Sequence, residues 1–80
     1  MKPSQNAYQS EFTIRTFGFR ELAQLYFPTN TPESAAKALR RLIRAYVGLP
    51  EQLAANGFNP GSRLMSPAVV DVLVKHLGEP

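Results

Sequence analysis

The sequence predicts a small, mainly α-helical domain with about four helices and a minimal two-stranded β ribbon. Apolar residues recur at helical spacing in several stretches. Two of these stretches open with a hydroxyl residue followed by proline, and glycine or proline closes most of them. The chain has 80 residues, of which 44% are hydrophobic and 19% charged, so we expect one globular domain with a small core.

The N-terminal part divides into a tail and a strand. Residues 1–11 are mostly polar and show no periodicity, which predicts a flexible tail before a single helical domain at 12–80. Phe12 and Ile14 then alternate with polar residues. This alternation predicts a short strand with both side chains facing inward, ended by Gly18.

Two helices follow with a short turn between them. In residues 20–27, Leu22, Leu25 and Tyr26 share one side, and Pro28 ends the helix. The second helix spans residues 32–46, with Thr31 as its cap and proline at its first position. Its predicted core side holds Ala35, Ala36, Leu39, Leu42, Ile43 and Tyr46.

The rest of the chain predicts two more helices and the second strand. A short helix begins at Pro50, contributes Leu53 and Ala54 to the core and closes at Asn56-Gly57. Residues 63–65 are expected to be extended and to pair with the first strand. The last helix runs from the Ser66 cap to Gly78, with a buried side of Val69, Val70, Leu73, Val74 and Leu77.

Val72 falls outside that stripe. Two interpretations of this apolar surplus stay open: the valines fill a small core, or they pack against a second copy of the chain.

The positive charge of the chain is concentrated on the second helix. Residues 31–46 hold four of the nine basic residues and one of the six acidic ones, so the net charge of +3 comes entirely from this segment. At about 100° per residue, the four basic side chains fall within an arc of roughly 100° opposite the core side. They are Lys37, Arg40, Arg41 and Arg44. The face is either simply solvated or a binding site for a polyanion.

The sequence lacks the residue patterns that enzymes, metal-binding proteins and membrane proteins require. The chain has no cysteine, and its one histidine, His76, has no neighbours at a metal-binding spacing. Serines, glycines and carboxylates form no recognisable catalytic or phosphate-cradling motif. We therefore expect no enzyme activity, cofactor, metal or small-molecule substrate. No apolar run reaches membrane-spanning length and no signal peptide is evident, which predicts a cytoplasmic protein without membrane association.

The stretch RELAQLYFPTNTPESAAKALRRLI, residues 20–43, resembles a helix-turn-helix, as in excisionase-like and winged-helix DNA-binding domains. The resemblance implies that the helix at 32–46 enters the major groove and that the strands serve as a wing. The sequence departs from the pattern at Pro28, where many such turns have glycine, and at Glu33, an acid at the start of the implied recognition helix.

A second resemblance covers residues 12–80, through the pieces FTIRTFG, ELAQLY, TPESAAKAL, NGF and SPAVVDVLVKHLGEP. Their order is similar to a domain-of-unknown-function family of small proteins from gut-dwelling anaerobic bacteria. That resemblance implies a complete natural protein, and it transfers no activity.

Two hypotheses of function follow. The first is a small DNA-binding regulator or accessory factor that neutralises phosphates with Lys37, Arg40, Arg41 and Arg44, with a further contact from Arg63. The alternative is a protein-interaction or homodimerisation module without nucleic-acid binding. It rests on the valine-rich last helix and on the aromatic residues Tyr8, Phe17, Phe19 and Phe27.

Overall fold

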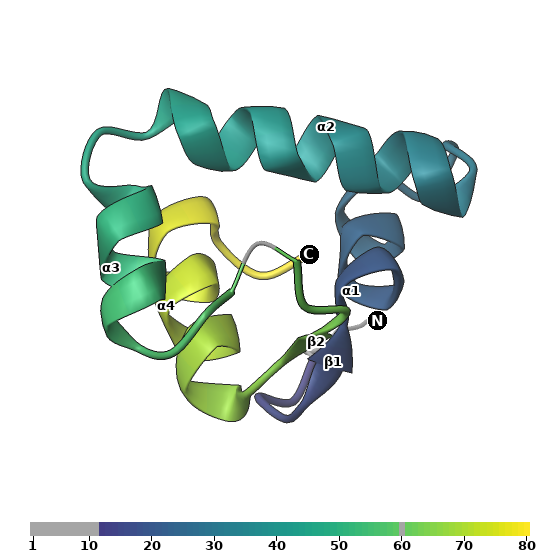
Figure 1. Ribbon diagram of the computed structural model, residues 1–80. Helices are drawn as coiled ribbons and strands as arrows, with labels where there is room; N and C mark the ends of the chain where they lie inside the picture. Colours follow the sequence, from purple (N-terminus) through teal and green to yellow (C-terminus); the bar gives the residue numbers. More distant parts are fainter. Residues whose placement is uncertain (1–11, 60) are drawn as a thin grey trace, which may run out of the picture.

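A computed structural model describes residues 12–59 and 61–80 and has the predicted mainly helical architecture (Figure 1). The order of elements is β1 (Phe17–Gly18), α1 (Phe19–Tyr26), α2 (Pro32–Ala45), α3 (Leu49–Ala55), β2 (Leu64–Met65) and α4 (Pro67–Leu77). The long helix α2 lies along one side of the molecule, above α1 at one end and α3 at the other. The strands and α4 lie on the opposite side, so no other helix or strand of the described residues covers one face of α2. The predicted tail at 1–11 lies outside the described residues.

The two-stranded ribbon forms as predicted, but its first strand lies further along the chain. β1 and β2 are antiparallel, with Phe17 opposite Met65 and Gly18 opposite Leu64. The prediction that Ile14 faces inward was wrong, since it is 39% exposed. Phe12 is half-buried and stacks on Phe17 with ring centroids 5.4 Å apart. Because β2 has only two residues, it offers no ladder partner to residues before Phe17.

Helix α1 begins one residue earlier than predicted and buries a different set of residues. Gly18 is both the last residue of β1 and the N-cap, and its amide donates to the Glu21 carboxylate at 3.1 Å. Leu25 was predicted to face the core and is 46% exposed. The buried residues of this short helix are Phe19, Leu22 and Ala23. Leu25 lies about 100° around the axis from Tyr26, beyond the narrow sector that the core covers.

Helix α2 begins where the sequence indicates. The Thr31 hydroxyl accepts a hydrogen bond from the Ser34 amide at 3.2 Å, and Pro32 is the first helical residue. The helix ends at Ala45, so Tyr46 is the C-cap and is exposed rather than part of the core side. Leu42 is only half-buried.

A tight turn then leads into α3, which starts at Leu49 instead of Pro50. Gly48 has φ of 84°, a left-handed conformation that glycine adopts without strain. Leu49 and Leu53 are buried, while Ala54, predicted to contact the core, is exposed.

The last helix, α4, fills the core. The Ser66 hydroxyl caps it, and Val69, Val70 and Leu73 are buried. Val72, Val74 and Leu77 are half-buried and pack against the core. Asp71 and Lys75 form the predicted pair at 3.0 Å. The valines therefore act mainly inside the molecule.

The core also uses three aromatic residues that were predicted to be surplus. Phe17 and Phe19 are buried, and Phe27 is half-buried against the core. Tyr8 lies outside the described residues. These side chains no longer argue for a second copy of the chain. Homodimerisation stays a prediction. Within the part of the chain that the structure describes, no helix has the length and apolar character to cross a membrane.

Candidate nucleic-acid interface

The four basic side chains of α2 lie on the face that no other described helix or strand covers. Lys37, Arg40, Arg41 and Arg44 are all exposed. The buried residues of the same helix, Ala35, Ala36, Leu39 and Ile43, lie on the opposite side. This division follows from the helical period, because residues three and four apart share a face while the core takes only one side.

None of these four side chains forms an ion pair within residues 12–59 and 61–80. The two ion pairs there join Arg15 to Glu21 at 2.9 Å and Lys75 to Asp71 at 3.0 Å. Glu33, in the first turn of α2, is the acidic residue of the same helix and forms neither pair. The face therefore presents four positive charges that no carboxylate neutralises in the described part of the molecule.

Arg40 is held at the edge of this face by an aromatic ring. Its guanidinium carbon lies 4.9 Å from the centroid of Phe19, a buried residue at the start of α1. An arginine above an aromatic face gains a cation–π interaction and keeps its N–H donors free for a ligand.

Arg63 lies near α2, where it lines a concavity together with Arg40. The Phe19 amide donates to the Arg63 carbonyl at 2.7 Å, which joins the start of β2 to the start of α1. Arg20, Arg40 and Arg63 then line one concavity of about 460 Å³, together with Phe19 and Leu64. The structure therefore adds Arg20 to the predicted set. No local pattern marks Arg20, because only the pairing of β1 with β2 brings Arg63 to it.

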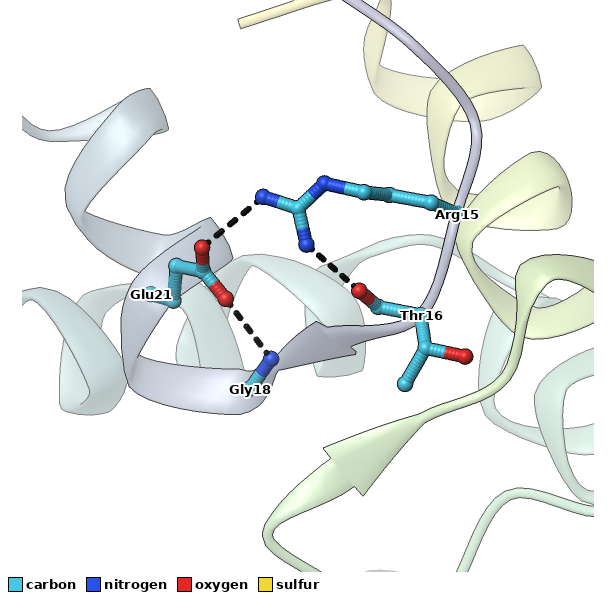
Figure 2. A network of polar contacts seen from close by, with 4 residues as sticks. All are labelled: Arg15, Thr16, Gly18 and Glu21. Atoms are coloured by element: carbon cyan, nitrogen blue, oxygen red, sulfur yellow. Dashed lines mark hydrogen bonds and ion pairs between the residues drawn. The ribbon is translucent and has the colours of Figure 1, made fainter.

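Arg15, which lies near this concavity, already has partners within the protein. Figure 2 shows the Arg15 guanidinium between the Glu21 carboxylate and the carbonyl of Thr16, with distances of 2.9 and 2.6 Å. Arg15 also lies 3.7 Å from the centroid of Phe17. The hydrogen bond from Arg15, followed by that from the Gly18 amide, lowers the pKa of the Glu21 carboxyl below its ordinary value. This network fixes the start of α1 and leaves Arg15 out of the unpaired set.

The turn between α1 and α2 is closed by side-chain contacts. The Gln24 amide donates to the Asn30 carbonyl at 3.0 Å, and the Asn30 amide lies 3.4 Å from the Ser34 hydroxyl. Ser34, the polar side chain at the start of α2 that a DNA base could meet, therefore already has a partner. The basic residues stand in the middle and later turns of the helix, which suits phosphate contacts better than base reading.

The described residues place no cluster of three or more His, Cys, Asp or Glu where a metal ion could bind. His76 lies near the end of α4, where its Nδ1 is 3.0 Å from the Val72 carbonyl oxygen. Its ring meets Tyr46 edge-on, with centroids 6.3 Å apart. These contacts explain His76 as a packing residue.

A family model described as a domain of unknown function, DUF4248, matches residues 13–80. The chain belongs to this family. The DUF4248 match includes all four helices, both strands and every basic residue discussed above. No curated protein and no solved structure matches the chain. The DUF4248 description names no activity, and the similarity to excisionase-like domains stays a prediction, so the case for a function rests on the geometry of the site.

Proposed function

We propose that this protein binds double-stranded DNA through the basic face of α2, defined by Lys37, Arg40, Arg41 and Arg44, with Arg20 and Arg63 at its edge. The observation that carries the proposal is that the four α2 side chains are exposed on the face opposite the core and form no ion pair within residues 12–59 and 61–80. Such a surface attracts the phosphate backbone, and binding releases condensed counterions from the DNA.

The expected binding depends little on DNA sequence. Lysine and arginine side chains from the middle of a helix neutralise phosphates, whereas specificity needs side chains aimed at base edges. Glu33 and Ser34 occupy the first turn of α2, and neither is a strong reader of a base edge there. An accessory or architectural role in a DNA complex fits this surface better than recognition of a defined operator.

The test is the salt dependence of DNA affinity, measured by fluorescence anisotropy of a labelled random-sequence duplex. Four neutralised phosphates give a log–log slope near −3.6, so the affinity should fall roughly 100-fold between about 50 and 200 mM salt. A slope near zero, or no binding at about 50 mM salt, would contradict the proposal.

The location of the site is tested by two charge-matched variants. Arg41→Gln removes one charge from the basic face and should reduce the magnitude of the slope by about 0.9. Lys75→Gln removes one charge from α4, where the side chain is exposed and paired with Asp71. It should leave both slope and affinity close to those of the unmodified protein. Equal effects of the two variants would mean that net charge, and not this face, determines binding.

A further inference from the structure

A second concavity lies between α2 and α3, and its lining is mostly apolar. Phe19, Ile43, Leu53 and Phe58 contribute to the walls of this cleft, which has a volume of about 280 Å³. The rings of Phe19 and Phe58 have centroids 6.1 Å apart and planes 24° from parallel. The cleft is thus built by α1, α2, α3 and the segment after α3, which come together only in the folded chain.

Two charged side chains also line the cleft. Arg40 and Arg44 are exposed and form no ion pair in the described residues. Because the guanidinium of Arg40 rests on Phe19, positive charge is held beside an apolar surface. A ligand that offers only an apolar group would leave this charge unused, and a purely anionic ligand would leave the apolar lining exposed to water.

The size of the cleft limits what it can hold. Small-molecule and cofactor sites usually occupy roughly 300–1,000 Å³, so a cleft of about 280 Å³ lies below that range. It suits one large apolar side chain better than a cofactor. Anchor residues of peptides bind in pockets of this kind, while neighbouring residues of the peptide provide the charge complementarity.

We propose that this cleft binds an acidic peptide segment of a partner protein, with one large apolar side chain in the cleft and adjacent carboxylates on Arg40 and Arg44. The site does not depend on the proposed DNA binding. The two ligands share Arg40 and Arg44, so an acidic peptide and DNA would compete for the same surface.

The probe is a set of three synthetic peptides, acetylated and amidated, added to the isotope-labelled full chain and followed by NMR chemical shifts. The peptide EDFED carries the anchor and the charges, EDAED lacks the anchor, and QNFQN lacks the charges. We expect EDFED to shift the signals of Ile43, Leu53 and Phe58 and to bind about 10- to 100-fold more tightly than EDAED, from burial of the aromatic side chain. QNFQN should bind more weakly than EDFED, and the difference should shrink with salt.

Two variants on α3 locate the peptide without removing a core residue. Ala54 is exposed and lines the cleft, whereas Ala55 is exposed on the same helix and does not line it. Ala54→Trp should therefore weaken EDFED binding at least about tenfold by filling the cleft, and Ala55→Trp should leave it unchanged.

Several outcomes would overturn the proposal. They are the absence of shifts at the cleft with millimolar EDFED, equal affinity for EDFED and EDAED, and equal effects of the two tryptophan variants. A cleft that responds to a thymidine oligomer and not to EDFED would be a nucleobase site, which also overturns it. None of these results depends on whether the chain binds duplex DNA, since no duplex is present.

Discussion

Arg15 and Arg41 have the same guanidinium group but lie in different surroundings. Arg15 is held by Glu21, Thr16 and the ring of Phe17, so its donors are used inside the molecule. Arg41 extends from the uncovered face of α2 and takes part in neither ion pair of the described residues. Residue type alone therefore does not identify a binding residue. The charge of an arginine is available to a ligand where no carboxylate of the folded chain pairs with it.

The Arg15–Glu21 contact makes a prediction about pH. The pKa of the Glu21 carboxyl is lower in the folded state than in the unfolded state. Such a carboxyl stabilises the fold at pH values above its ordinary pKa, here 4.5. That stabilisation is lost as the pH falls through the lowered pKa. Glu21→Gln should therefore flatten the decline of stability below about pH 5. The measurement is the midpoint of urea unfolding across a pH series.

Glu51→Gln is the control, because it removes the same charge from an exposed carboxyl that forms no ion pair within residues 12–59 and 61–80. If Glu21→Gln and the unmodified protein lose stability in parallel as the pH falls, the Arg15–Glu21 contact does not persist in solution.

At the scale of the element, helix α1 shows how narrow the core-facing side of a short helix is. Leu22 is completely buried, and Leu25, one turn further along, is 46% exposed. Both leucines satisfy the helical period, so the sequence pattern predicts the same role for each. The packing of the other elements against α1 decides between them, because it covers Leu22 and leaves Leu25 largely in water.

Alanine substitutions should separate the two leucines. Leu22→Ala should cost about 2–5 kcal/mol of unfolding free energy, through lost burial and the cavity left behind. Leu25→Ala should cost less than about 1 kcal/mol, since much of its side chain already contacts water and alanine favours the helix. Chemical denaturation of both variants measures the difference. Similar losses would show that α1 is rotated about its axis relative to this structure.

The two helix starts with a hydroxyl residue before proline are where the sequence predicts them. Thr31-Pro32 and Ser66-Pro67 both form the expected caps, with hydroxyls accepting from Ser34 and Val69. Gly48, Gly57 and Gly78 have positive φ beside helix ends. These signals are local, because a cap needs only the residue and the next turn of the helix.

At the scale of the whole molecule, one hydrogen bond joins segments that are distant in sequence. The Tyr26 hydroxyl, at the end of α1, donates to the Gly78 carbonyl, just after α4. Burial, and then the negative charge of Glu79, raise the pKa of Tyr26 to about 12. The fold therefore favours the neutral phenol, which is the form that can donate.

Stability should respond to alkaline pH through Tyr26. An acid whose pKa is raised by folding stabilises the fold at pH values below its unfolded pKa, which is near 10 for tyrosine. For Tyr26 this contribution is lost as the pH rises from about 10 to about 12. The stability advantage of the unmodified protein over Tyr26→Phe should thus be largest near neutral pH and shrink above about pH 10. Urea unfolding at several alkaline pH values measures this difference.

Tyr46→Phe, at an exposed position, controls for the loss of a phenol. A difference between Tyr26→Phe and the unmodified protein that stays constant from neutral to alkaline pH would exclude a titrating Tyr26.

Local sequence patterns predict the fold class, the two hydroxyl–proline helix starts and the basic face of residues 37–44, because caps and the 3.6-residue period act over one or two turns of chain. The same patterns misplaced Ile14, Leu25 and Ala54, whose burial depends on which element covers them. Only the tertiary structure brought Arg20 and Arg63 to Arg40 and formed the apolar cleft beside Arg44. These sites combine segments up to several tens of residues apart, and no local pattern encodes how such segments meet.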